Sequence, residues 1–292
     1  MNYDHFFHAG NPADVVKHAA LVLLLRELTR KDGPIHYVET HAGAGWYALS
    51  EPEGEWRQGV AKLLSRSARR RLPELSPYLD LLPVTEKGTL ERYPGSPALA
   101  QAVLREQDTL QLYELHPEDR ATLDRALNVR GDRRVETFCA DGYRGLLGTK
   151  PKGDARLVAH IDPPFEQVDE WDAIDETVRR LAVKRPGSTV MLWYPVKSGP
   201  PHEGRPEALR ASLERARTKG AAVELVLRGG LLTPRPGAQP KVRGVMTGTG
   251  LLFVDAPHRA LARLAAALPE LGRSLARPED GLGFELRWWS WG

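Results

Sequence analysis

Apolar residues dominate the first long segment with a helical pattern, which runs from Pro12 to Leu28. Asn11 stands in the N-cap position and Pro12 at the first helical position, so the segment is predicted to be a helix. Asp14 and His18 lie four residues apart beside Lys17 and share one face of that helix. An isolated helical pair of this kind is usually a surface contact.

Short apolar runs with strand-like composition recur along the rest of the chain, separated by helical stretches. The predicted strands are 35–39, 109–114, 134–138, 156–161, 188–194, 222–227 and 250–254, the last of which closes the series. This alternation predicts an α/β fold, with a mostly parallel sheet and helices on both faces. In such sheets ligands bind at the carboxyl ends of the strands.

A turn with two glycines follows the first predicted strand. Thr40-His41-Ala42-Gly43-Ala44-Gly45 comes directly after Glu39, and the glycines allow a tight turn that a nucleotide-like ligand can approach closely. Many strand-to-loop turns carry two glycines. This segment alone therefore fits a cofactor site or a purely structural turn.

The acidic residue that would hold ribose hydroxyls is late in the sequence. It is expected about 20 residues after such a turn, but the candidate, Glu114, lies 69 residues after Gly45 (114 minus 45). Residues 96–106 have the pattern of the intervening helix, with Ser96 as N-cap and Pro97 at the first position. We therefore expect residues 47–93 to be an inserted helical subdomain on the rim of the site.

Charge is distributed unevenly along the chain. The 292 residues are 41% hydrophobic and carry a formal net charge of +3, which does not by itself indicate a nucleic-acid partner. The insertion contains a basic block without acidic residues: Arg57, Lys62, Arg66, Arg69, Arg70 and Arg71. A second acid-free block contains Arg228, Arg235, Lys241 and Arg243. Both blocks suit contact with phosphates, and equally a solvated face.

Several classes of protein are excluded. The longest apolar run, 19–25, is far shorter than the ~20 residues that span a bilayer, and the N-terminus lacks a secretory pattern, so we expect a cytoplasmic protein. The single cysteine, Cys139, excludes internal disulfides and a cysteine-based zinc site. We expect Cys139 to be a small buried apolar residue.

Asp162-Pro163-Pro164-Phe165, directly after the strand 156–161, is the strongest candidate for chemistry. Two consecutive prolines lack N–H donors and stiffen the backbone, so the Asp162 carboxylate and the Pro163 carbonyl are fixed acceptors for an amine with two N–H groups. Phe165 is expected to stack on a base, an interaction worth ~1–3 kcal/mol.

The chemistry of a planar amine explains why two acceptors are needed. The lone pair on N6 of adenine is delocalised into the ring, so the nitrogen must be drawn toward a tetrahedral geometry before it attacks an activated methyl group. A sulfonium cofactor supplies such a methyl, and neither a metal nor a protein nucleophile is then required. By itself the tetrad fits amine methylation on nucleic acid or protein, or a rigid structural turn.

The order of the motifs strengthens the enzymatic interpretation. Ala140-Asp141-Gly142 follows the strand 134–138 and lies between Glu114 and Asp162. The Asp141 carboxylate can accept a hydrogen bond from the adenine amine of the cofactor, although an aspartate before glycine is also typical of a turn. Together these motifs predict a methyltransferase that uses S-adenosyl-L-methionine.

The chain resembles the RlmJ-type 23S ribosomal RNA adenine-N6 methyltransferases over nearly its whole length. The matching segments are Tyr3, Phe7-His8-Ala9-Gly10-Asn11-x-Ala13-Asp14-Val15-x-Lys17-His18, Thr40-His41-Ala42-Gly43-Ala44-Gly45, Tyr93-Pro94-Gly95-Ser96-Pro97, Leu104-Arg105-Glu106-Gln107-Asp108, Glu114-Leu115-His116-Pro117, Ala140-Asp141-Gly142, Ile161-Asp162-Pro163-Pro164 and Leu192-Trp193-Tyr194-Pro195-Val196. The N-terminal block and the last segment are not general methyltransferase features, so the match is narrow.

The resemblance implies a class I methyltransferase fold, Rossmann-like, whose catalytic domain comprises residues 1–46 and 94–292. It implies methylation of the N6 amine of an adenine in 23S ribosomal RNA, giving N6-methyladenosine. The implied cofactor contacts are His18, His41, Ser96, Glu114, Asp141, Gly142 and Asp162, to which we add Gly43 and Gly45. We expect a monomer that binds no metal.

The resemblance also implies roles in chemistry and substrate binding. Asp162 matches the catalytic acid or base of the family, and Pro163 and Phe165 complete the predicted catalytic set. Tyr3 matches a residue near the target adenosine, so the N-terminal aromatic arm would cover cofactor and base. Lys17 shares its helical face with Asp14 and His18, which are then more than a surface pair. The predicted substrate contacts are Tyr3, Lys17, Phe165, Arg69, Arg70 and Arg71.

The sequence departs from the family pattern at Phe165, where relatives commonly have tyrosine. Beyond about Pro200 the resemblance depends mainly on Arg243-Gly244-x-Met246-Thr247-x-Thr249-Gly250. The tetrad equally permits a DNA adenine-N6 methyltransferase. A protein glutamine methyltransferase usually has Asn first in the tetrad, unlike Asp162, and the retained Asp162 argues against an RNA-binding module with a vestigial site.

Neutralising Arg69, Arg70 and Arg71 together should weaken RNA binding and flatten its dependence on salt, because fewer counterions are released from the phosphates. Binding isotherms at several salt concentrations measure this slope. A slope equal to that of the unaltered protein would make the block a solvated face.

Overall fold

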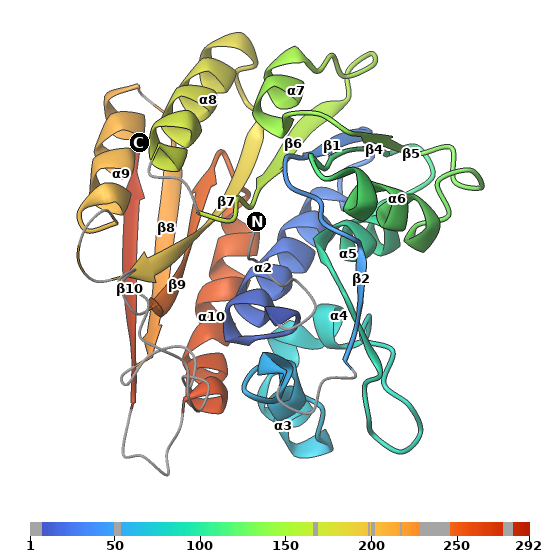
Figure 1. Cartoon of the computed structure of the whole chain (residues 1–292). Coiled ribbons are helices and arrows are strands. Elements are labelled where there is room, and N and C mark those ends of the chain that lie inside the picture. The colour runs from blue at the N-terminus through green and yellow to red at the C-terminus, as the bar shows by residue number, and fades with distance from the viewer. Residues whose placement is uncertain are drawn as a thin grey trace.

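The central sheet has the strand order β10-β8-β9-β7-β6-β1-β4-β5 in the described part of the chain (Figure 1). The computed structural model describes residues 8–49, 54–165, 169–197, 199, 202–216, 218–227, 246–276 and 283–292. Tyr3, Phe7 and the second basic block lie outside these residues. The strands are β1 Ile35–Glu39, β4 Thr109–Tyr113, β5 Val135–Phe138, β6 Arg156–Ile161, β7 Thr189–Lys197, β8 Gly220–Leu227, β9 Met246–Val254 and β10 Phe284–Trp291.

Most strands point in one direction, which confirms the predicted sheet. β1 pairs in parallel with β4 and β6, β4 with β5, and β6 with β7. β9 is antiparallel to both β7 and β8, so β8 has the direction of β7 and only β9 and the edge strand β10 are reversed among the described strands. The prediction that 250–254 closes the series was wrong, because β10 follows and pairs with β8.

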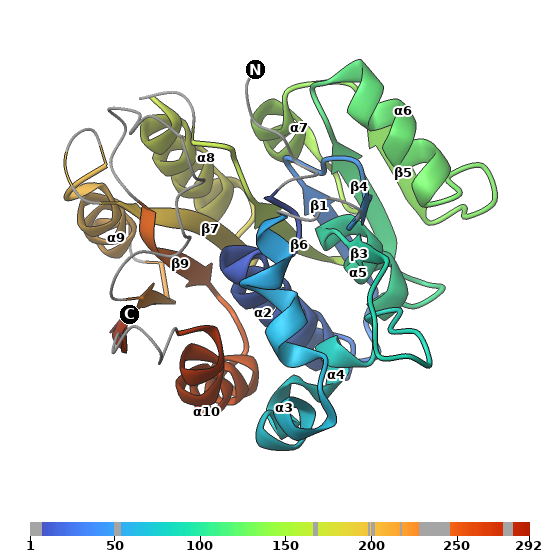
Figure 2. The same ribbon diagram turned by 60° about the horizontal axis from the view of Figure 1, so that its bottom comes forward.

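Helices cover both faces of the sheet. Figure 2 shows α7 (Gly142–Gly148), α8 (Glu170–Lys184) and α9 (Arg205–Arg215) on one side, with α2 (Pro12–Leu28) and α10 (His258–Leu275) on the other. Two hydrophobic clusters fill the spaces between these layers. α5 (Ser96–Val103) packs beside α2, and Leu123 of α6 (Pro117–Ala126) belongs to the cluster that contains the buried residues of α2 and α10.

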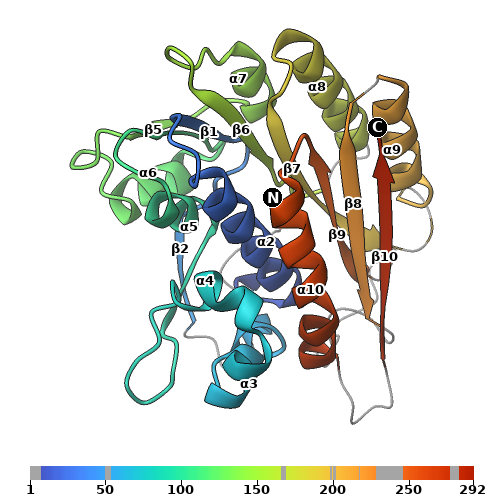
Figure 3. The ribbon, with the colours of Figure 1, turned by 180° about the vertical axis from the view of Figure 1, so that it is seen from behind.

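α2 is packed against other elements on several sides, so its buried residues are not confined to one face of the helix. It begins as predicted, with the Asn11 side chain accepting a hydrogen bond from the Asp14 N–H at 3.0 Å. The sheet lies on one side of it, and α5 and α10 pack against it (Figure 3). Lys17 and His18 are therefore buried, at 8% and 3% exposed, so the surface contact first expected for the Asp14–His18 pair was wrong.

The inserted segment leaves and returns through a two-stranded ribbon, β2 (Trp46–Ala48) and β3 (Arg92–Pro94). Between these strands lie only short helices in the described residues, chiefly α3 (Arg66–Arg71) and α4 (Ser76–Leu79). The segment packs on α10, because the Lys62 ammonium donates to the Leu275 carbonyl at 2.8 Å and Arg263 pairs with Glu74 at 2.9 Å. Its independence as a subdomain stays a prediction.

Two local expectations were wrong. α5 begins at Ser96 with Gly95 as N-cap, because the Ser96 hydroxyl donates to Glu39 instead of capping the helix. Cys139 is exposed just beyond the end of β5, not buried.

No helix in the described residues is long and apolar enough to cross a membrane.

A buried carboxylate joins α2, β1 and β4. Asp108 is fully buried and accepts hydrogen bonds from the Ile35 N–H at 2.9 Å and the Arg105 N–H at 2.7 Å. The Arg105 guanidinium pairs with Asp108 at 2.9 Å and donates to the Thr29, Lys31 and Gly33 carbonyls beyond α2. Burial alone would raise the pKa of Asp108, but the hydrogen bonds from Arg105 and Ile35 and the Arg105 charge outweigh it and lower this pKa.

Asp108→Ala should lower the free energy of unfolding by about 1–3 kcal/mol, because it leaves the buried Ile35 N–H and the partly buried Arg105 guanidinium without their acceptor. Urea denaturation measures the loss. Glu176→Ala breaks the exposed Glu176–Arg180 pair and should cost only about 0.3–0.5 kcal/mol. Equal losses in the two variants would refute the anchoring role of Asp108.

Candidate active site

A cavity of about 490 Å³ opens at the carboxyl ends of the parallel strands. The loops after β1, β4, β5 and β6 line it, together with the first turns of α2 and the end of β7. Sequence-predicted residues that line it are Lys17, His18, His41, Gly43, Ser96, Glu114, Asp141, Gly142, Asp162 and Pro163. The topology therefore brings most of the predicted site together.

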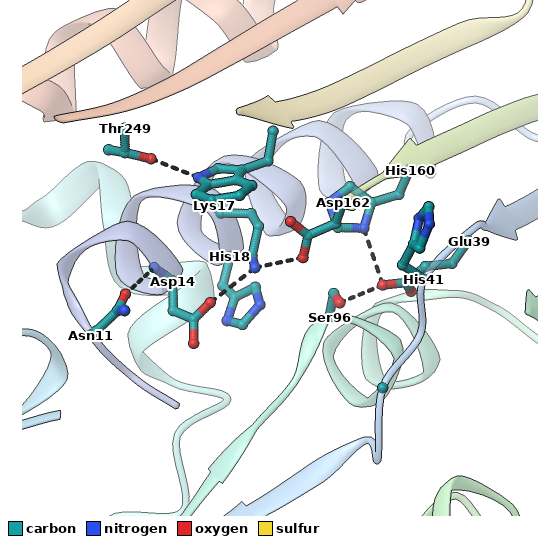
Figure 4. Close-up of polar contacts among 12 residues, drawn as sticks. Asn11, Asp14, Lys17, His18, Glu39, His41, Ser96, His160, Asp162 and Thr249 are labelled. Atoms are coloured by element: carbon teal, nitrogen blue, oxygen red, sulfur yellow. Dashed lines mark hydrogen bonds and ion pairs between the residues drawn. The ribbon is translucent and has the colours of Figure 1, made fainter. Parts of the chain in front are cut away.

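The Lys17 ammonium lies between two carboxylates (Figure 4), and Lys17 lines the cavity. Its Nζ is 2.6 Å from Asp162 Oδ2 and 2.9 Å from Asp14 Oδ1. Burial alone would lower the pKa of Lys17, but the charges of Asp14 and Asp162 and their hydrogen bonds raise it above its ordinary value. Lys17 therefore stays protonated, and it fixes the Asp162 carboxylate across the gap between α2 and β6.

Asp14 is held in its charged form by the same arrangement. Burial would raise its pKa, but Lys17, His18 and the hydrogen bond from the Gly10 N–H bring it to about 2. Two carboxylates thus share one buried cation, in agreement with the rule that buried charges are paired.

The tetrad Asp162-Pro163-Pro164-Phe165 divides between cavity and core. Asp162, Pro163 and Pro164 line the cavity, and no described residue hydrogen-bonds to Asp162 Oδ1. Phe165 is only 4% exposed, with a φ of 50°, and its ring packs against Trp171 at 4.8 Å and Trp193 at 5.9 Å. The base-stacking role predicted for Phe165 would require this ring to leave its present contacts.

Glu114 anchors the glycine turn. Its Oε2 accepts from the Gly43 N–H at 2.8 Å, and its Oε1 accepts from the His116 N–H at 2.9 Å. Gly43 has a φ of 61° and Gly45 a φ of 82°, a region that favours glycine. Each carboxylate oxygen keeps further acceptor capacity, so Glu114 can hold two hydroxyls of a ribose.

The N-terminus of α7 meets the loop after β1. Asp141 caps α7 by accepting from the Tyr143 and Arg144 N–H groups. A Cβ on Gly142 would lie 2.0 Å from the Thr40 carbonyl oxygen, so only glycine permits this approach. The His41 ring packs edge-on against Tyr143 at 5.1 Å, and the Tyr143 hydroxyl donates to Glu170 at 2.5 Å.

Ser96 connects the cavity to a buried carboxylate, Glu39. Glu39 is fully buried and accepts from the Ser96 hydroxyl, from the Tyr37 hydroxyl at 2.9 Å and from His160 Nδ1 at 3.1 Å. Because the only hydrogen of the Ser96 hydroxyl points at Glu39, Ser96 offers the cavity an acceptor. The position of Glu39 before the glycine turn was noticed in the sequence, but no role was assigned to it.

His18 is also buried, at 3% exposed. Its Nδ1 is hydrogen-bonded to the Tyr93 hydroxyl at 2.7 Å, and that hydroxyl is 2.9 Å from the Tyr78 hydroxyl. Burial lowers the pKa of His18 to about 3, against the opposing attraction of Asp14. His18 is therefore a neutral imidazole at physiological pH.

Comparison with known proteins decides the family. Residues 32–290 match the family described as Ribosomal RNA large subunit methyltransferase D, RlmJ. The chain belongs to this family. It is similar to Ribosomal RNA large subunit methyltransferase J of Haemophilus influenzae (33% identity, 99% of this chain and 98% of that one) and of Escherichia coli (39%, 67% and 70%). A solved Legionella pneumophila structure matches with TM-score 0.81 at 29% identity, covering 98% of this chain and 99% of that chain.

Membership of the RlmJ family confirms the predicted class I methyltransferase fold and makes the chain a methyltransferase. Within the described residues, no group of three His, Cys, Asp or Glu side chains is arranged to hold a metal ion.

The three arginines predicted to contact RNA, Arg69, Arg70 and Arg71, lie outside the cavity. Arg69 pairs with Asp80 at 3.0 Å, Arg71 pairs with Glu270 at 2.7 Å, and Arg70 is exposed on α3. None of the three arginines lines the cavity. Their contact with RNA stays a prediction, as does that of Tyr3, which is outside the described residues.

Several cavity residues carried no individual prediction. Trp193, Pro195 and Lys197 alternate along β7 and so present one face of the strand to the cavity. Met246 on β9 and the Tyr143–Glu170 pair, on α7 and α8, also line the cavity. The period of two along 193–197 was the available signal, but an apolar strand in a parallel sheet gives little indication of which face is open.

The neutral His18 should make the protein less stable in acid. Below about pH 6.5 the unfolded chain binds a proton at this histidine, whereas the folded chain does not until about pH 3. Stability attributable to His18 is therefore complete above pH 6.5 and falls as the pH drops, by at most about 1.4 kcal/mol per unit.

Urea denaturation between pH 7 and pH 5 tests this expectation. His18→Gln should flatten the fall in unfolding free energy with decreasing pH, while His258→Gln at the exposed start of α10 should not. An unchanged slope in the His18 variant would contradict the assignment.

Proposed function

We propose that the protein transfers the methyl group of S-adenosyl-L-methionine to the N6 amine of an adenine in 23S ribosomal RNA. The observation that carries the proposal is the Asp162 carboxylate, held by Lys17 at 2.6 Å beside the rigid Pro163-Pro164 segment. It lies in the same cavity as the glycine turn and Glu114.

The residues of the cavity fit S-adenosyl-L-methionine. Its volume of about 490 Å³ lies in the usual range for small-molecule sites. Glu114 would hold the ribose hydroxyls, Asp141 the adenine amine, and Ser96, an acceptor toward the cavity, the ammonium group. The bound sulfonium supplies an activated methyl group.

The chain's own contribution is to position the attacking amine. With Asp162 Oδ2 engaged by Lys17, Oδ1 accepts one N–H of the amine, and the Pro163 carbonyl accepts the other. These two hydrogen bonds localise the nitrogen lone pair and aim it for in-line attack. The proton released from the methylated nitrogen passes to Asp162 or to water.

Several observations favour ribosomal RNA among the possible substrates. Both curated relatives are named as ribosomal RNA large subunit methyltransferases, and a large-subunit RNA substrate would place the enzyme in the cytoplasm. DNA adenine remains chemically equivalent at the tetrad. A glutamine amide of a protein is the third candidate, against which Asp162 in place of Asn argues.

Asp162→Ala should lower methyl transfer by roughly 10²–10³-fold or more, the effect of removing one positioned polar group from a reacting centre. Asp172→Ala on α8, which breaks the pair between Asp172 and Arg205 of α9, is the matched control and should keep full activity. Cofactor affinity of the Asp162 variant should remain measurable by calorimetry. Wild-type rates in that variant would exclude the role of Asp162.

The substrate is identified by incubating the wild-type enzyme with labelled cofactor and separate pools of ribosomal RNA, DNA and protein. The labelled pool is digested to single nucleosides or amino acids. N6-methyladenosine from ribosomal RNA is expected, and label in DNA or glutamine would replace the proposal with the corresponding rival.

A further inference from the structure

The strand order places the residues that line the cavity in two halves, one on each side of Asp162. The loops after β1, β4 and β5 form the half with Glu114 and the glycine turn. β6, which Asp162 directly follows, lies in the sheet between β1 and β7. The opposite half is formed by Trp193, Pro195 and Lys197 of β7 and Met246 of β9. If the first half holds the cofactor, the base must enter the second.

Trp193 is the aromatic side chain that the structure fixes in that second half. Its indole N–H donates to the Thr249 hydroxyl at 2.7 Å (Figure 4). Thr249 is itself only 1% exposed on β9, diagonally across the strand pair. The indole therefore cannot turn without breaking this partly buried hydrogen bond.

The position of the Trp193 ring relates it to the reacting group. The Lys17 ammonium lies over one face of the ring, 5.5 Å from its centroid, and the same ammonium is 2.6 Å from Asp162. A base packed beside Lys17, on the part of the ring that lines the cavity, would thus present its exocyclic amine close to the Asp162 carboxylate. Phe165 contacts the indole edge-on from the core, so it supports the ring and is screened from the base.

Resting on the proposed function, we propose that Trp193 is the surface on which the target base packs. Thr249 is a positioning residue that fixes the plane of the indole. Stacking of a base on an aromatic side chain contributes enough that its loss corresponds to roughly 5- to 150-fold in affinity.

Two pairs of variants separate stacking from simple packing. Trp193→Phe keeps a flat ring, whereas Trp193→Leu keeps apolar bulk without one; kcat/KM for ribosomal RNA should fall roughly 5- to 150-fold in the Leu variant and less in the Phe variant. Thr249→Val removes the acceptor and should lower kcat/KM, while Thr249→Ser restores it. The affinity for S-adenosylhomocysteine, measured by calorimetry, should be unchanged in all four.

Trp288→Phe is the control, because Trp288 is 39% exposed on the edge strand β10 and lies outside the cavity. Adenosine monophosphate should quench the tryptophan fluorescence of this control, and the quench should be lost in Trp193→Phe. Equal kcat/KM values for the Phe and Leu variants, or an undiminished quench, would overturn the assignment while leaving the proposed function intact. Absence of RNA methylation by the wild-type enzyme would overturn both.

Discussion

The buried ammonium of Lys17 is the interaction on which the site depends. A charge at this depth is stable only with partners, and its two partners come from different parts of the chain: Asp14 from one turn of α2, Asp162 from the end of β6. The ion pair with Asp162 therefore fixes α2 against the carboxyl end of β6. Asp162 and the first turns of α2 thus hold fixed positions on the wall of one cavity.

Local sequence signals predicted the elements whose stability is local. Asn11 and Pro12 set the start of α2, and the apolar runs set the parallel strands. Ser96 has the composition of an N-cap but does not act as one, because Glu39, 57 positions earlier, competes for its hydroxyl. β10 was missed, although the alternation in Phe284-Glu285-Leu286-Arg287 and the tryptophans that follow are typical of a strand. It pairs with β8 at the edge of the described sheet.

The candidate site, too, could be predicted only where local motifs determine it. Asp162, Glu114 and Asp141 could be placed together from motif order alone, since consecutive strands of a parallel sheet end at one edge. The depth of Phe165 depends on Trp171 and Trp193, which lie 6 and 28 positions further along. The sequence around Phe165 therefore does not indicate its burial, and its stacking on a base stays a prediction.

The β2–β3 ribbon bears on how a family of this kind can diversify. Because Trp46 and Pro94 face each other across the ribbon, everything between them enters and leaves the main body at one point. A loop of the segment that touches little else, such as that around Gly88, can change in length without moving the ends of β1 and β6. Tyr78 and Tyr93 differ, because their hydroxyl groups lead to His18, so a change that moves these tyrosines would also alter the wall of the cavity.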